Sequence, residues 1–291
     1  MESVVKAIDA LGRDNGDADR FLTTFERSTE AWEVCYGLLV SSTNPTYRFF
    51  AAKMLYSKAQ RDYIQLDSAG ASQLKASLLQ QLVAQGKDSN VPMNICRYMC
   101  LAISALAIQG LESNVVSEIL QHLNELVQVR PLIILEKLCV LSEECGDRKL
   151  RITSDQRDDF RRQLTQSVPE VFGFLDTLLL HQAQGPRDTI PKIMTCLSLW
   201  IENTDVPGDF LLAAPVFTKA MGCFNRPELV CEACEVVVQA VLQVRRSARD
   251  NPNAVNLMLS LSQHVLSLRQ HWRVILGSQA EVVPRNWDDA H

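Results

Sequence analysis

The stretch 29–62, TEAWEVCYGLLVSSTNPTYRFFAAKMLYSKAQRD, decides the fold. Apolar residues recur in it at helical spacing on both sides of a polar break at 41–45. Each predicted helix therefore has one apolar face that must be buried. The pair predicts an antiparallel helical hairpin, which can bury both faces only against neighbouring hairpins. The apolar positions are Ala31, Trp32, Cys35, Leu38 and Leu39 in the first helix, and Tyr47, Phe50, Ala51, Met54 and Leu55 in the second.

The same pattern continues through the rest of the chain. Further helical segments come in pairs, with most Gly and Pro residues between them, at a spacing of roughly 40 to 50 residues that is typical of HEAT and armadillo arrays. We therefore predict an all-α protein, an α-solenoid of about six HEAT-like helical hairpins. The solenoid should form one N-terminal arch over residues 1–281, followed by a frayed tail at 282–291. Individual helices are expected at 93–108, from Asn114 through Leu126, and at 210–221, 227–244 and 254–276.

Composition limits the classes of partner. The 291 residues carry a net charge of −5, and Lys and Arg form no long block that could follow a phosphate backbone. No uncharged apolar run reaches the roughly 18 residues of a membrane span, and the N-terminus lacks the order of a signal peptide. We expect no nucleic acid or membrane as a partner, and a location in the cytoplasm and nucleus.

Nine cysteines raise the question of a metal site. Two pairs have suggestive spacing, Cys96 with Cys100 and Cys231 with Cys234, and both lie in segments with strong helical periodicity. A zinc site needs two further ligands at matching spacing, and no histidine supplies them. We therefore predict buried thiols and no metal or other cofactor.

The search for catalytic motifs gives little. The sequence has no Gly-rich phosphate loop, no G-x-S-x-G and no H-E-x-x-H. The acidic pairs at 143–144 and 158–159 are expected at a helix end or on a solvated face, with no histidine beside them. The sequence thus predicts a binding surface and no enzyme activity.

A series of residues, in order along the chain, resembles the importin-β (karyopherin-β) superfamily. The likeness to its N-terminal domain covers about residues 4–66, and within the superfamily the chain is most similar to transportin-SR, the importer of serine/arginine-rich proteins. The residues that carry the resemblance are Ala7-Ile8-Asp9-Ala10-Leu11, Phe21-Leu22, Phe25, Ala31-Trp32-Glu33-Val34, Leu38-Leu39, Phe50-Ala51-Ala52-Lys53-Met54, Pro131-Leu132, Leu141-Ser142-Glu143-Glu144, Leu150-Arg151-Ile152 and Cys196-Leu197-Ser198-Leu199-Trp200.

This resemblance implies a nuclear transport receptor that binds the GTP form of the small GTPase Ran and the Phe-Gly repeats of the nuclear pore. Family members are much longer, and the part that holds protein cargo lies far beyond residue 291. We therefore expect an N-terminal arch without the cargo-binding part, either a fragment of a receptor or a short natural or mis-spliced product. Binding of serine/arginine-rich cargo is expected only where the missing part is present. The alternative is a HEAT-repeat scaffold with no role in nuclear transport.

The resemblance also implies where Ran would bind. In the family the GTPase lies against the second helices of the first few hairpins, which here start near Thr46, Pro92 and Pro131. The alternative, that polar residues on these helices are merely solvated, stays open. The candidates, which interrupt the apolar pattern and are expected to face outward, are Tyr47, Lys53, Asn94, Arg97 and Lys137.

Overall fold

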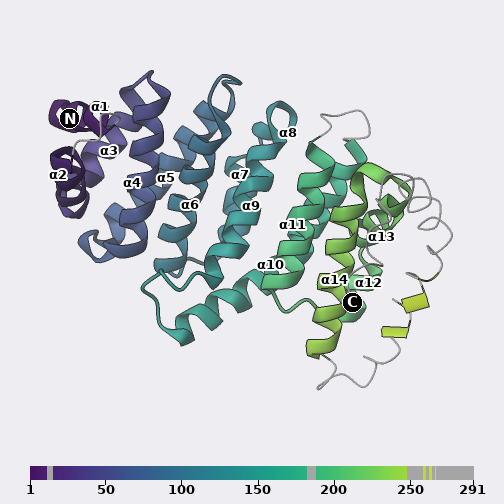
Figure 1. Cartoon of the computed structure of the whole chain (residues 1–291). Coiled ribbons are helices and arrows are strands. Elements are labelled where there is room, and N and C mark those ends of the chain that lie inside the picture. The colour runs from purple at the N-terminus through teal and green to yellow at the C-terminus, as the bar shows by residue number, and fades with distance from the viewer. Residues whose placement is uncertain (12–15, 182–187, 248–257, 260–261, 264–265, 267–291) are drawn as a thin grey trace, which may run out of the picture. The chain divides into compact units, whose positions relative to one another are not determined.

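The computed structural model is an all-α, HEAT-like solenoid, as predicted (Figure 1). Every regular element in the part of the chain that it describes is a helix. The helices fall into two compact units, Met1–Val171 (unit 1) and Phe172–His291 (unit 2). The described residues are 1–11, 16–181, 188–247, 258–259, 262–263 and 266.

Unit 1 contains the first hairpins of the solenoid. A short 3₁₀ turn, η1 (Tyr63–Gln65), separates the second pair from the third, and α10 (Ser154–His181) starts in unit 1 and continues into unit 2. The expected helix from Asn114 through Leu126 is divided into α7 and α8 by a tight turn at 123–125. The helices in order are α1 (Glu2–Leu11), α2 (Gly16–Arg27), α3 (Glu30–Ser41), α4 (Pro45–Arg61), α5 (Ser68–Gly86), α6 (Met93–Gln109), α7 (Val115–His122), α8 (Leu126–Val129) and α9 (Pro131–Gly146).

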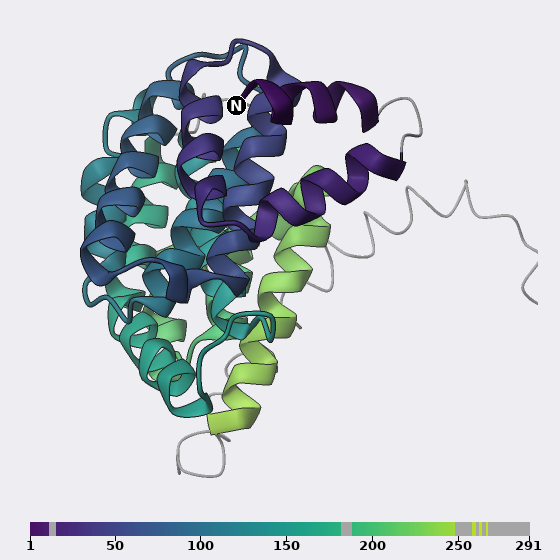
Figure 2. The same cartoon turned by 90° about the vertical axis from the view of Figure 1, so that its left-hand side faces the viewer.

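The helices of unit 1 form two rows. We call the first helices of the successive hairpins (α1, α3, α5, and α7 with α8) the A-helix row, and the second helices (α2, α4, α6 and α9) the B-helix row. Helix α1 packs on α2 and also contacts α4. Along the B-helix row α4 packs on α6 and α6 on α9, while α3 packs on α4 and α5 on α6 across the rows. Figure 2 shows unit 1 from its N-terminal end, with α1 and α2 nearest the viewer.

Helix α6 is the centre of unit 1. It is apolar on nearly every side, and α4, α5 and α9 enclose it. Ile95, Met99 and Ile103 are at most 1% exposed. A helix enclosed in this way leaves few positions for contact with a partner, and these lie mainly in its first turns.

The hairpin at 29–62 is held by a buried lysine. Lys58 in α4 is fully buried, and its Nζ donates hydrogen bonds to the backbone oxygens of Glu26 and Ser28 at 3.0 and 2.8 Å. The same Nζ lies 4.9 Å from the centre of the Trp32 ring, and Trp32 is only 7% exposed. Gln65 accepts hydrogen bonds from both side chains. This cluster joins the end of α2, α3, α4 and η1, and it confirms that Trp32 is buried.

Unit 2 repeats the plan with one difference. The expected helix at 210–221 is interrupted, because Pro215 has no backbone N–H and disfavours a helical conformation at Ala214, whose ψ is 125°. Trp200 is fully buried, and α11 packs on α14. The elements are α11 (Thr189–Asn203), α12 (Gly208–Ala213), α13 (Pro215–Gly222), η3 (Cys223–Asn225), η4 (Pro227–Leu229) and α14 (Val230–Ser247).

The order of the described helices fits about six hairpins, as expected from the sequence. The predicted helix at 254–276 and the predicted tail at 282–291 lie outside the described residues, apart from the five isolated positions between 258 and 266.

Candidate protein-docking surface

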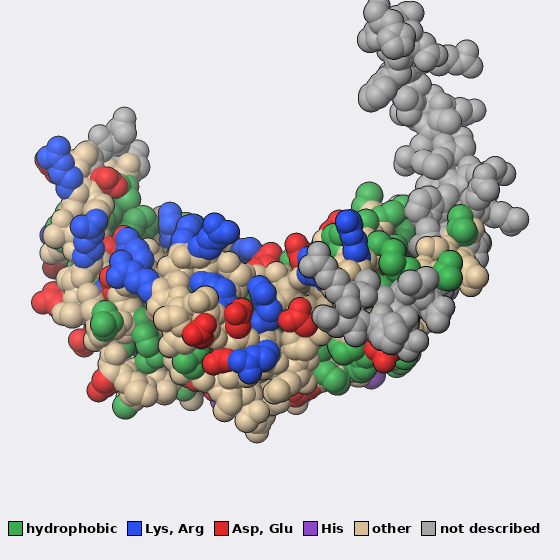
Figure 3. Space-filling model, turned by 90° about the horizontal axis from the view of Figure 1, so that it is seen from below, with side chains coloured by type: hydrophobic (Ala, Val, Ile, Leu, Met, Phe, Trp, Pro, Cys, Tyr) green, Lys and Arg blue, Asp and Glu red, His purple; other side chains and the backbone are tan. Residues whose placement is uncertain are grey.

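The candidate surface is the outward face of the B-helix row, built by α4, α6 and α9. Each of these helices begins at or next to a proline: Pro45, Pro92 and Pro131. Asn44 caps α4 by accepting a hydrogen bond from the Thr46 N–H at 2.9 Å. Side chains on this face therefore have fixed positions relative to the core. Unit 1 carries many Lys and Arg side chains with Asp and Glu among them (Figure 3).

Two of the predicted residues lie on α4 and have different environments. Tyr47 is half-buried, and its hydroxyl donates a 2.7 Å hydrogen bond to Asp9 in α1, which raises the pKa of the phenol. Lys53 is exposed and lines a pocket between α4 and α2. Tyr47 thus ties two helices together, whereas Lys53 is available to a partner.

Two further predicted residues lie at the start of α6. Asn94 is exposed in the first turn. Arg97 has a side chain that is 46% exposed, and it forms an ion pair with Glu136 in α9 and a second, at 3.9 Å, with Glu143. Arg97 therefore links neighbouring B helices and still presents part of its guanidinium to solvent.

The prediction that Lys137 faces outward is wrong. Its side chain is fully buried between α9 and α6, where Nζ donates to the Ser104 hydroxyl at 2.5 Å and to the Cys100 carbonyl at 3.4 Å. Burial lowers the pKa of Lys137 to about 8. Neighbours enclose α9 on almost every side, so a polar residue in its sequence does not mark an exposed face. Lys137 is not part of the docking surface.

A polar network on this face was not foreseen. The Tyr56 hydroxyl in α4 donates a 2.7 Å hydrogen bond to Glu144 in α9, and Gln60 bonds to that hydroxyl and to Asp147. Glu144 is 5% exposed, and its burial raises the pKa of the carboxyl group to about 7. The sequence showed a Glu143-Glu144 pair but gave no sign of which of the two turns inward.

The A-helix row carries a separate groove between α5 and the end of α7. Its volume is about 360 Å³. Leu79, Val83 and Ala84 supply an apolar wall, and Lys87 forms an ion pair with Glu125 across the helices. The sequence alone did not identify this groove, because its two walls are about 40 residues apart in the chain.

Other kinds of site find little support among the described residues. No group of His, Cys, Asp and Glu in that part of the chain could hold a metal ion. Cys96 and Cys100 are fully buried, whereas Cys231 is exposed and Cys234 is half-buried, so the prediction of buried thiols fails for the second pair. No helix in the described part is long and apolar enough to cross a membrane.

Comparison with known proteins gives matches along most of the chain. The model of the importin-beta N-terminal domain matches residues 18–84, and the model of exportin 1-like proteins matches residues 92–237, half of the chain. The first match covers α2 to α5, and the second runs from α6 into the first half of α14.

Curated relatives agree with these matches. The chain is 25% identical to transportin MOS14 of Arabidopsis thaliana over 94% of its own length, and 26% identical to human importin-13 over the same share. It is 29% identical to the mRNA transport regulator MTR10 of Saccharomyces cerevisiae over 88% of its length. The alignments span 29%, 28% and 26% of those proteins, respectively, which is little more than a quarter of each. This chain belongs to the importin-β superfamily.

Proposed function

We propose that this chain acts in nuclear transport as a karyopherin-β-type receptor segment whose B-helix row binds Ran-GTP. The observation that carries the proposal is the match of residues 18–84 to the importin-beta N-terminal domain, because these residues build α2 and α4 at the start of the row. Three of the predicted residues are solvent-exposed on that row: Lys53, Asn94 and Arg97.

The mechanism we propose links binding free energy to conformation. In a solenoid each hairpin contacts mainly its neighbours, so small rotations between hairpins add up to a change in pitch. A ligand that prefers one pitch lowers the affinity of a ligand that prefers another, by the same coupling free energy in both directions. Ran-GTP and cargo would compete in this way without sharing a site.

The test is charge reversal at Lys53. Lys53→Glu should weaken binding of Ran-GTP, measured by isothermal titration calorimetry, without lowering the thermal midpoint, because exposed substitutions change stability by no more than about 0.5 kcal/mol. Lys6→Glu is the matched control, since Lys6 is an exposed lysine on α1 of the A-helix row. Equal affinity of both variants and the parent would remove Lys53 from the Ran surface.

Arg97 needs a milder substitution. A glutamate at this position would face Glu136, which is 5% exposed, and would destabilise the contact between α6 and α9. Arg97→Gln removes the charge and keeps a hydrogen-bond donor. We expect it to weaken Ran-GTP binding more than Lys6→Glu does.

The groove between α5 and α7 supports a second binding function. We propose that it holds a phenylalanine of the Phe-Gly repeats of the nuclear pore, because it offers an apolar wall of Leu79, Val83 and Ala84 in a surface hollow. Ala84→Glu would place a charge on this wall. It should reduce capture of a Phe-Gly peptide and leave the chain's retention on a Ser-Gly control peptide unchanged.

The cargo class and the cellular location of the protein are proposed on the same basis as its transport role. The curated relatives include a transportin and importins, and the proposed role is that of a binding protein without enzyme activity, present in the cytoplasm and nucleus. Serine/arginine-rich proteins are the proposed cargo class, bound through chain segments that correspond to the part of the relatives outside the match. A scaffold with no role in transport is the outcome if neither Ran nor Phe-Gly peptides bind.

A further inference from the structure

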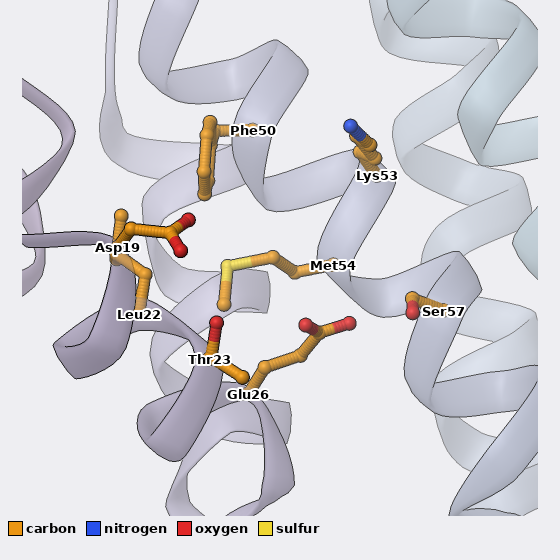
Figure 4. A pocket seen from close by; sticks show the side chains of 8 residues that line it. All are labelled: Asp19, Leu22, Thr23, Glu26, Phe50, Lys53, Met54 and Ser57. Carbon is orange, nitrogen blue, oxygen red and sulfur yellow. The ribbon is translucent and has the colours of Figure 1, made fainter. Parts of the chain in front are cut away.

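A small pocket opens on the B-helix row between α2 and α4. Its volume is about 200 Å³. Leu22 from α2 and Met54 from α4 form an apolar base and are 4% and 5% exposed. Phe50 stands above them, with its ring over the hollow (Figure 4). The pocket is therefore apolar at its base and aromatic on one side.

Oxygen atoms of α2 supply the polar side. Figure 4 shows Asp19, Thr23 and Glu26 with their oxygens toward the hollow. Glu26 already forms an ion pair with Arg61 at 2.7 Å, whereas Asp19 forms no ion pair with any other described residue. Lys53 lines the rim, but its amine points away from the centre (Figure 4).

We propose that this pocket binds an arginine side chain presented by a protein partner. The aliphatic stem of an arginine would cover Leu22 and Met54, and its guanidinium plane would stack on Phe50 while it donates hydrogen bonds to Asp19. Lysine fits less well, because its compact ammonium cannot stack and donate in a plane at the same time. A purely apolar side chain would leave the Asp19 carboxylate desolvated without a partner.

This inference goes beyond the proposed function. It names the chemical group that the pocket recognises, and it holds for any protein partner that presents an arginine on this surface. A test with an isolated arginine derivative separates it from binding of Ran, because the derivative reports on the pocket whether or not Ran binds.

The experiment is a titration of the full chain with N-acetyl-arginine amide, followed by NMR of ¹³C-labelled methionine methyl groups. The Met54 methyl signal, assigned with the Met54→Leu variant, should shift and saturate with a dissociation constant on the order of millimolar, which suits one side chain. N-acetyl-citrulline amide has the same shape without the charge and should give no saturable shift. Equal shifts with both compounds would overturn the inference.

Two substitutions with opposite effects sharpen the test. Asp19→Asn should weaken arginine binding about tenfold, as loss of a charged hydrogen bond does, and Lys53→Gln should strengthen it by removing a like charge from the rim. Asp17→Asn is the matched control, because Asp17 lies on α2 and outside the pocket lining. The inference fails if the Asp19 variant, with an otherwise unchanged spectrum, binds arginine as the parent does.

Discussion

At the scale of single residues, two lysines of unit 1 are fully buried for different reasons. Lys58 has backbone and side-chain oxygens around its ammonium group and the Trp32 ring beside it, so its charge is compensated. Among the described residues, Lys137 donates hydrogen bonds to a hydroxyl and to a more distant carbonyl, in a largely apolar environment. Lys58 therefore joins elements of the fold, whereas burial of the Lys137 charge lowers stability by an amount that the rest of the core offsets.

Trp32 should be a main source of stability for the first hairpins. Trp32→Ala removes a large side chain that is 7% exposed, and it should lower the free energy of unfolding by about 3 to 5 kcal/mol. Urea unfolding followed by circular dichroism measures this. A midpoint equal to that of the parent would show that the cluster around Lys58 does not need the indole ring.

Lys137 should not contribute to binding, and its buried charge should not add to stability at pH 7. Lys137→Met replaces a buried ammonium with an apolar side chain of similar length. The thermal midpoint of this variant should therefore equal that of the parent or lie above it. Affinity for Ran-GTP should stay within about twofold of the parent value, because exposed contacts are untouched. A lower midpoint would show that the hydrogen bond to Ser104 outweighs the cost of burial.

The error at Lys137 shows what a single sequence can and cannot predict at this scale. Helical period identifies which residues share a face, and it correctly predicted that Trp32 is buried. It does not report how many faces of a helix are covered. In α9 nearly all faces are covered, so a lysine that interrupts the apolar pattern was assigned to the surface although the core holds it.

At the scale of elements, the B-helix row is joined by polar contacts as well as by apolar packing. Tyr56 and Gln60 in α4 reach past α6 to Glu144 and Asp147 near the end of α9. Arg97 adds a contact between α6 and α9. These contacts tie three successive hairpins, so they are expected to limit changes of pitch in this part of the solenoid.

Glu144 makes this link dependent on pH. The pKa of its carboxyl group is raised from 4.5 to about 7, mainly by burial; Asp147 adds to the rise, and Tyr56 and Lys137 oppose it. The folded state therefore binds a proton that the unfolded state releases, and the free energy of unfolding should fall as pH rises from about 4.5 to about 7. The total change for this one group is at most about 3 kcal/mol.

Glu144→Gln should remove that dependence, because the amide keeps an acceptor for Tyr56 and does not titrate. We expect the variant to gain stability over the parent as pH rises from about 5 toward 7.5, measured as the urea midpoint at several pH values. Parallel pH profiles for the two proteins would contradict the burial of Glu144 as an ionisable group.

Element boundaries were predictable where the chain carries a clear stop. Pro131 starts α9 as expected. Pro215 is an equally clear signal in the sequence, but the helix at 210–221 was expected to continue through it, and the structure shows a break there. The pockets were not predictable, because each is lined by residues from helices that are separated in the chain and meet only through tertiary packing.

At the scale of the whole molecule, the proposed transport function depends on a series of similar hairpins and not on one reactive site. Membership of the importin-β superfamily makes transport the natural proposal, and the chain spans little more than a quarter of the curated relatives it matches. The proposed role therefore concerns the binding of Ran and of nuclear-pore peptides by the described helices.

The most direct measurement is a titration of this chain with Ran loaded with a non-hydrolysable GTP analogue and, in parallel, with GDP. We predict that the GTP form binds at least about tenfold more tightly, a difference of about 1.4 kcal/mol, and that Lys53→Glu weakens this binding while Lys6→Glu does not. Equal affinity for the two nucleotide forms, or no binding of either by a folded chain, would contradict it.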